Sequence, residues 1–136
     1  MTDPNHPSGT DRIFEAYNSL ENKNDYESII NLQGDMPLID PLVLESVNEP
    51  LMHGYMIGTI ATDISNKERE NSNITKVKIN WNKTHSVGKS IDFYKESNKQ
   101  VENIYQHVGI YSFKPDALYN FVSMQPSNNE IEKKLE

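Results

Sequence analysis

The hydrophobic and polar positions near the start of the chain predict one helix, preceded by a turn-rich segment at residues 1–10. Four hydrophobic residues follow the i, i+3, i+4, i+7 spacing of one helix face, namely Ile13, Ala16, Tyr17 and Leu20. Thr10 is the predicted N-cap, and Asp11 suits the positive end of the helix dipole. Residues 21–27 are polar and predict a loop.

A strand–loop–helix unit is predicted next. Residues 28–32 form a short apolar run that is typical of a buried strand. A Gly34–Asp35 turn follows, at the carboxyl end of this strand, where open α/β sheets bind ligands. Asp40 and Pro41 then have the residue types of an N-cap and a first helical residue. The inner face of this second helix is predicted to be Val43, Leu44 and Val47.

Several strands are predicted in the second half of the chain. Residues 59–62 are predicted to form a short strand. Residues 73–81 alternate between apolar and polar positions, which predicts a half-exposed strand with Lys76 and Lys78 on its wet face. Residues 91–94 are its expected partner across a turn.

The clearest strand is predicted at residues 105–113. Pro115 begins a helix whose inward residues are expected to be Ala117, Leu118, Phe121 and Val122. Ser127 and Glu130 have the spacing of a capping box for a last helix. This order of elements predicts a mixed α/β sheet with helices on its faces.

Composition and charge narrow the class of protein. The 136 residues have the length of one domain. The net charge of −7 disfavours nucleic-acid binding, because nucleic-acid binders usually carry a basic stripe. The chain has no cysteine, which excludes disulfides and thiolate metal sites. No apolar run approaches the ~20 residues of a membrane span and no signal peptide is evident, so we expect a cytoplasmic protein without membrane insertion.

The first candidate site is the stretch of residues 6–12 at the start of the first helix. Backbone N–H groups at a helix N-terminus attract phosphate or carboxylate, and Arg12 can add a bidentate clamp. The alternative is an ordinary capped helix with a surface arginine.

The second candidate site is the turn after the first predicted strand. Asp35 can hold Mg²⁺ that bridges nucleotide phosphates, because Mg²⁺ takes one or two carboxylates plus phosphate oxygens. The Gln33 amide can recognise a base or a hydroxyl, and Gly34 lets a ligand approach the backbone. The alternative is a turn that simply joins strand to helix.

The third candidate site is one face of the strand at residues 105–113. His107 and Tyr111 share this face, roughly 13 Å apart along the strand, and can line a groove for a polyhydroxy acid. The alternative is a half-buried amphipathic strand with tyrosine in the core. The four histidines lack metal-ligand spacing, so no zinc site is predicted.

In their order along the chain, these stretches resemble the motifs of one family, the 3-deoxy-manno-octulosonate cytidylyltransferases (CMP-KDO synthetases). The family carries the patterns H-x-S-G-T-[DE]-R, V-x-V-Q-G-D-E-P-L-I-D-P, N-x-x-K-V and H-x-G-I-Y-x-[YF]. The corresponding stretches here are residues 6–12, 30–41, 73–77 and 107–113. The match covers almost the whole chain.

The resemblance implies a nucleotide-diphospho-sugar transferase fold, which is Rossmann-like. It implies a nucleotidyltransferase that transfers CMP from CTP to KDO, or to a close eight- or nine-carbon acid, and releases pyrophosphate. The cofactor would be Mg²⁺, the product would serve lipopolysaccharide biosynthesis, and the family forms homodimers.

Matching motif positions imply a role for each candidate residue. Asp35 and Arg12 would be catalytic, with Asp35 holding the metal and Arg12 contacting nucleotide phosphate or sugar acid. The implied substrate-binding residues are Gln33, Gly34, His107, Tyr111, Glu130 and Glu136.

Two family motifs are absent from the sequence. One is the basic loop resembling I-P-A-R-x-x-S-x-R-x-P-x-K-P, which grips the triphosphate, and the other is a V-D-T-x-x-D stretch with the second metal carboxylate. We therefore expect residues 1–136 to be a single partial cytidylyltransferase domain, truncated and inactive alone. The alternative is a non-catalytic remnant, or half of a split enzyme that needs a partner chain.

Overall fold

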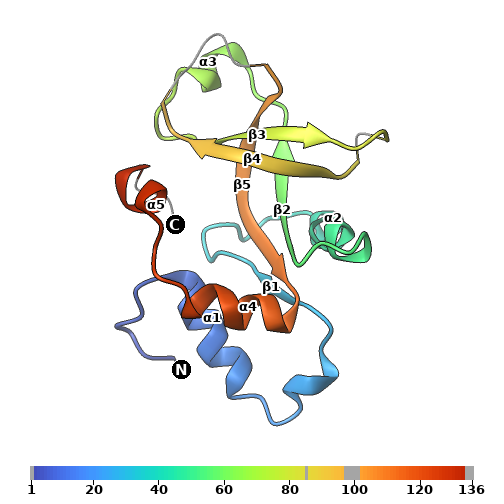
Figure 1. Ribbon diagram of the computed structural model, residues 1–136, viewed down its shortest axis with the longest axis vertical. Helices are drawn as coiled ribbons and strands as arrows, with labels where there is room; N and C mark the ends of the chain where they lie inside the picture. The colour runs from blue at the N-terminus through green and yellow to red at the C-terminus, as the bar shows by residue number, and fades with distance from the viewer. Residues whose placement is uncertain (1, 85, 97–101, 134–136) are drawn as a thin grey trace. The chain divides into compact units, whose positions relative to one another are not determined.

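A computed structural model describes residues 2–84, 86–96 and 102–133, except for the side chains of residues 129, 130 and 133 (Figure 1). In chain order the elements are α1 (Gly9–Asn18), η1 (Lys23–Asp25), β1 (Ile29–Asn31), α2 (Pro41–Met52), β2 (Ile57–Thr62), α3 (Asn66–Arg69), β3 (Lys76–Trp81), β4 (Gly88–Tyr94), β5 (Ile104–Phe113), α4 (Pro115–Ser123) and α5 (Asn128–Lys133).

The chain divides into two compact units. The first unit comprises Met1–Thr59 and Gly109–Pro126, and the second comprises Ile60–Val108 and Ser127–Glu136. Strand β5 therefore contributes residues to both units.

Hydrogen bonds join the strands in the order β1-β5-β3-β4, and β2 also pairs with β5. In the first unit, β1 runs antiparallel to β5 with Asn31 opposite Tyr111. In the second unit, β3 runs antiparallel to β4 and to the start of β5, where Lys78 lies opposite Ile104. These strands and the helices confirm the predicted α/β class.

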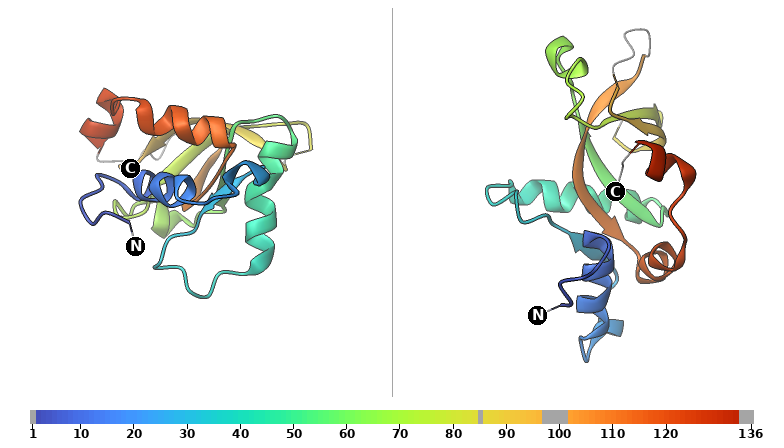
Figure 2. Two further views of the ribbon diagram at one scale, coloured as in Figure 1. Left: turned by 90° about the horizontal axis from the view of Figure 1, so that it is seen from below. Right: turned by 90° about the vertical axis from the view of Figure 1, so that its left-hand side faces the viewer.

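Helix α1 begins earlier than the sequence predicted. Its N-cap is Ser8, not Thr10, because the Ser8 hydroxyl accepts a hydrogen bond from the Asp11 N–H at 3.2 Å. The predicted apolar face is only partly correct, because Ala16 and Leu20 are exposed. Figures 1 and 2 show α1 lying against α4, and the rings of Phe14 and Tyr119 meet there with centroids 6.0 Å apart.

Helix α2 forms as its local signals predicted. The Asp40 carboxylate accepts a hydrogen bond from the Leu42 N–H at 2.9 Å, and Pro41 is the first helical residue. Val47 is fully buried, and its carbonyl accepts a 2.5 Å hydrogen bond from the buried Ser112 hydroxyl of β5. The core of the first unit consists of Val47, Leu51, Ile110, Phe113, Ala117 and Leu118.

Strands β3 and β4 form the hairpin expected in the second unit. The buried residues here are Val77, Ile79, Val87, Ile104 and Lys76. The alternating pattern is interrupted by a register shift between Lys78 and Ile79. The charged loop before β3 contains the short helix α3, which a capping box between Ser65 and Glu68 begins.

The prediction that Lys76 lies on a wet strand face is wrong. Its side chain is only 1% exposed. The ammonium donates hydrogen bonds to the backbone carbonyls of Asn71 and Lys95, each at 2.6 Å. Burial lowers the pKa of the Lys76 amine. The loop before β3 and the residue that follows β4 thus cover a face that alternation alone assigns to solvent.

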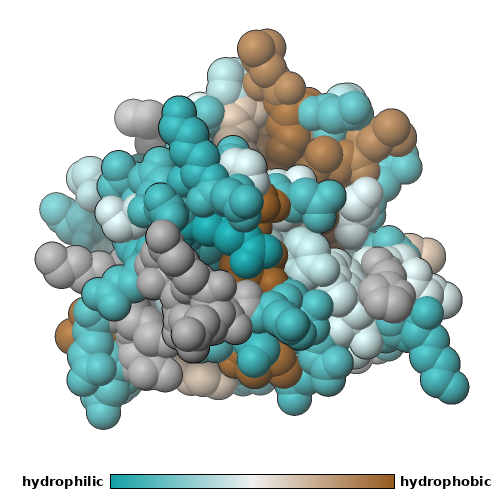
Figure 3. All heavy atoms as spheres, turned by 90° about the horizontal axis from the view of Figure 1, so that it is seen from above, coloured by the Kyte–Doolittle hydropathy of each residue, from teal (hydrophilic) through white to brown (hydrophobic). Residues whose placement is uncertain are grey.

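Hydrophilic residues predominate on the face of the surface shown in Figure 3, where hydrophobic side chains gather in separate areas. Across the described ranges, no helix combines the length and the hydrophobicity needed to cross a membrane.

Candidate functional site

The turn after β1 exposes the Asp35 carboxylate. A hydrogen bond from the Met36 N–H to the Gln33 carbonyl, at 3.2 Å, closes this turn. Gly34 and Asp35 are both exposed. The structure shows no hydrogen bond or ion pair for the Asp35 side chain among the residues it describes. This carboxylate is therefore available to a ligand.

The Gln33 side chain lies against the backbone of β5. A Cβ atom placed on Gly109 would be 3.0 Å from the Gln33 Nε2, 3.3 Å from its Cδ and 3.4 Å from its Oε1. Gln33 is half-buried as a result. Sequence reasoning missed Gly109, although a glycine inside a strand is itself a signal of close approach by another group.

The start of α1 lies close to the end of β1. A Cβ atom on Gly9 would be 4.0 Å from the Nδ2 of the buried Asn31. At this helix terminus the Ser8 hydroxyl donates to the Asp11 carboxylate at 2.5 Å and accepts from the Asp11 N–H. The Ser8 cap therefore already uses the Asp11 N–H, one of the helix N–H groups that an anion would need. Arg12 is exposed, so its guanidinium is the more accessible group for an anion.

The segment before α1 is attached to the helix through Glu15. The Glu15 carboxylate bonds the His6 Nε2 and accepts a 3.0 Å hydrogen bond from the Asp3 N–H. The hydrogen bond with His6, and then the one from Asp3, lower the pKa of Glu15. Sequence reasoning missed this contact, which no local spacing signals.

Tyr111 is the last of the predicted site residues that lie in the first unit. It is half-buried opposite Asn31 of β1, and its ring stacks on Phe113 with centroids 6.1 Å apart. The first unit therefore contains Arg12, Gln33, Gly34, Asp35 and Tyr111.

His107 belongs to the second unit. Its ring packs edge-on against Phe93, with centroids 5.1 Å apart. The backbone N–H of His107 donates to the Thr75 carbonyl at 2.9 Å. Burial lowers the pKa of His107 to about 4. At neutral pH the ring is therefore uncharged and can offer a ligand a hydrogen bond but not a positive charge.

The last predicted helix, on which Glu130 and Glu136 were implied to bind substrate, is only partly described. Glu130 lies in α5, and its side chain is outside the described part of the structure. Glu136 lies outside the described residues altogether.

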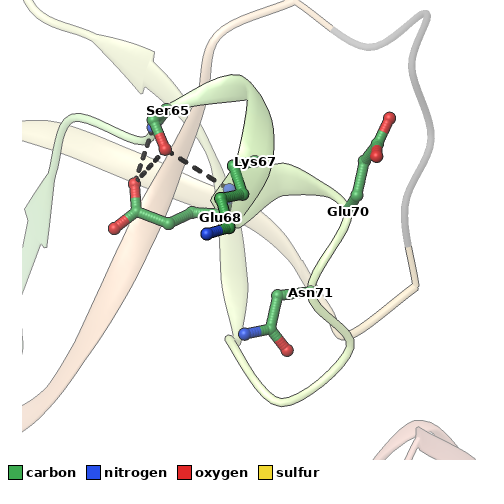
Figure 4. Close-up of a pocket in the computed structure, with 5 residues that line it drawn as sticks. All are labelled: Ser65, Lys67, Glu68, Glu70 and Asn71. Carbon is green, nitrogen blue, oxygen red and sulfur yellow. Dashed lines mark hydrogen bonds between the residues drawn. The ribbon is translucent and has the colours of Figure 1, made fainter.

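Two hollows in the described part of the surface lie away from the predicted residues. One in the second unit is lined by Ser65, Lys67, Glu68, Glu70 and Asn71 (Figure 4). Its Glu68 carboxylate accepts hydrogen bonds from the Ser65 N–H and hydroxyl, at 2.8 and 2.6 Å, and these bonds lower the pKa of Glu68. Another, in the first unit, lies between the end of α2 and the start of α4. Neither contains a candidate site residue.

The candidate metal site has a single carboxylate. In the parts of the chain that the structure describes, no three His, Cys, Asp or Glu side chains are grouped as metal ligands. An exposed, unpaired Asp35 nevertheless fits Mg²⁺, because this ion often takes one or two protein carboxylates and completes its shell with phosphate oxygens and water.

The low pKa of His107 predicts a pH-dependent stability. Unfolded histidine titrates near 6.5 and folded His107 at about 4, so the unfolded chain takes up this proton first as the pH falls. Between pH 7.5 and 4.5 the free energy of unfolding should therefore fall by about 2 kcal/mol more in the wild type than in His107→Gln. Urea unfolding of both proteins at both pH values tests this prediction. The other titrating groups are the same in both proteins, so their contribution cancels in the comparison. Equal losses would show that His107 is not buried as described.

Comparison with known proteins places this α/β chain, with its exposed acidic turn, among the nucleotidyltransferases. A family model described as cytidylyltransferase matches residues 1–136. The chain therefore belongs to the cytidylyltransferase family.

Its similarity to individual members extends over the whole chain. It is 36% identical over 139 residues to the 3-deoxy-manno-octulosonate cytidylyltransferase of Paramagnetospirillum magneticum, covering 100% of this chain and 56% of that protein. It is 37% identical to the one of Rhodopseudomonas palustris strain CGA009, with the same coverage.

A solved structure of CMP:2-keto-3-deoxy-manno-octonic acid synthetase complexed with CTP aligns with a TM-score of 0.82 and 28% identity, over 99% of this chain and 55% of that one. The chain thus spans about half the length of the relatives it matches.

Proposed function

We propose that this chain takes part in transferring CMP from CTP to KDO, with release of pyrophosphate. The observation that carries the proposal is the exposed, unpaired Asp35 beside Gln33, whose amide lies against β5, in a chain similar over its full length to enzymes named for this reaction. The CTP bound to the structural neighbour supports a nucleotide substrate. The product would serve lipopolysaccharide biosynthesis, and a homodimer is the assembly we propose.

Each candidate residue has a chemical role in this proposal. Asp35 would hold Mg²⁺, which supplies positive charge against the phosphates. The exposed Arg12 would contact phosphate or the sugar-acid carboxylate, to which its fork of N–H groups is suited. Gln33 and Gly34 would line the pocket through an amide and an open backbone.

The remaining roles concern the acceptor. Tyr111 would offer its hydroxyl to the sugar acid. His107 would offer a ring nitrogen of its neutral imidazole to the sugar acid, since burial lowers its pKa to about 4. Glu130 and Glu136 would act from the acidic C-terminal segment. Catalysis would then depend on holding the acceptor oxygen in line with the α-phosphorus.

The test is pyrophosphate release by the purified chain with CTP, Mg²⁺ and KDO. Residues 1–136 are expected to be inactive alone, so any release that the chain does show should fall at least about 100-fold in Asp35→Asn, because this variant removes the carboxylate charge while it keeps the side-chain size. The matched control is Asp25→Asn, which changes another exposed carboxylate of the first unit and should leave the rate unchanged. Omitting KDO shows how much release is hydrolysis.

Binding of CTP is measured in parallel by calorimetry, with and without Mg²⁺. If the chain binds CTP through Asp35 but releases no pyrophosphate, it contributes a binding part and not the whole reaction. If it neither binds CTP nor releases pyrophosphate, the proposal is wrong for this chain.

A further inference from the structure

Gly109 of β5 and Gln33, which lies two residues past the end of β1, are close neighbours. The register of β1 and β5 pairs Asn31 with Tyr111. Continued by two residues, the same register brings Gln33 opposite Gly109. Cross-strand neighbours have Cβ atoms about 5 Å apart, so the side chain of one residue normally meets the side chain of the other. Because Gly109 has no side chain, the Gln33 side chain instead meets the backbone of β5.

The missing side chain decides where the Gln33 amide lies. All three heavy atoms at the end of Gln33 lie within 3.4 Å of the point that a Cβ on Gly109 would occupy. A methyl group there would press on the amide and not on rigid backbone. Because the glutamine side chain is flexible, the amide would move aside and the strand would keep its place.

We propose that Gly109 is a positioning residue: it leaves room for the Gln33 amide to pack against β5, where the amide can bond a hydroxyl of the substrate. This inference rests on the proposed CMP transfer. A glutamine fixed by packing presents a donor and an acceptor in one arrangement, which favours a polyhydroxylated ligand over one lacking the matching hydroxyl. The neighbouring Asp35 and Gly34 lie at the same turn.

The experiment compares Gly109→Ala, Gln33→Ala and the double variant in steady-state pyrophosphate release. We expect each single variant to lower kcat/KM for the recognised substrate about tenfold or more. The double variant should be no worse than Gln33→Ala alone, because Gly109 acts only through the amide. Separate KM values for CTP and KDO identify the substrate concerned. Losses that multiply in the double variant would overturn the proposal.

A structural readout separates this inference from the proposed function. In the ¹⁵N spectrum of the chain, Gly109→Ala should shift the side-chain NH₂ resonances of Gln33. The control Gly9→Ala places its new methyl no closer than 4.0 Å to a neighbour and should leave them unchanged. If Gly109→Ala does not move these resonances, the positioning role is wrong whether or not the chain releases pyrophosphate. If it moves them in a chain without activity, only the proposed reaction fails.

Discussion

Replacing Lys76 with methionine should lower the free energy of unfolding by about 3 kcal/mol. Methionine has a similar length, but it leaves the carbonyls of Asn71 and Lys95 without the ammonium that now bonds both at 2.6 Å. Each hydrogen bond to a charged group contributes roughly 1.5–3 kcal/mol. The net loss is smaller than the sum, because methionine also removes the cost of burying a charge.

Urea unfolding at pH 7 measures this loss. Lys78→Met is the matched control, since Lys78 lies two residues further along β3 and is exposed. Its effect should stay within about 0.5 kcal/mol. Similar effects of the two substitutions would mean that the Lys76 ammonium does not hold the two carbonyls in solution.

The second large effect is expected for Gly58→Ala in β2, which should cost about 3 kcal/mol. The new Cβ would lie 2.5 Å from the Val47 carbonyl oxygen and 2.6 Å from the Ser112 hydroxyl. Neither atom can move away cheaply, because one is helix backbone and the two are hydrogen-bonded to each other in the core. The substitution therefore separates β2 from α2 or breaks that bond.

Gly34→Ala is the control for Gly58→Ala in thermal and urea unfolding. A Cβ on Gly34 would meet nothing within 4 Å, so the same chemical change should alter stability only slightly. If both variants lose the same stability, the loss does not come from the close packing at Gly58.

Local signals explain the parts of the fold that the sequence predicted. Asp40 and Pro41 begin α2 because a cap and a fixed φ act within one turn of helix. The alternation through residues 73–81 and 105–113 predicted β3 and β5, since period two is a property of each strand alone. The first residue of the first helix was harder to predict, because Ser8 and Thr10 are both good caps and only the fold selects Ser8.

The features that the sequence did not reveal depend on distant segments. Alternation placed Lys76 on a polar face but could not show that residues near Asn71 and Lys95 cover it. The contact of Gln33 with Gly109 depends on a register between strands far apart in the chain. The site residues followed from the order of motifs, and the structure groups five of them in the first unit, while their roles in catalysis stay predictions.

Strands β3 and β1 both pair with β5, but they differ in how long a stretch of chain lies between the paired residues. Strands β3 and β4 are neighbours along the chain, with Trp81 opposite Gly88, so this hairpin closes a short loop at little entropic cost. Ile104 then joins Lys78, whereas the pairing of Phe113 with Ile29 closes most of the polypeptide. Local contacts form fastest and long-range pairing is slow. The hairpin should therefore be the folding nucleus, and β1 should be the last strand to dock, so the turn that carries Asp35 becomes ordered only at the end of folding.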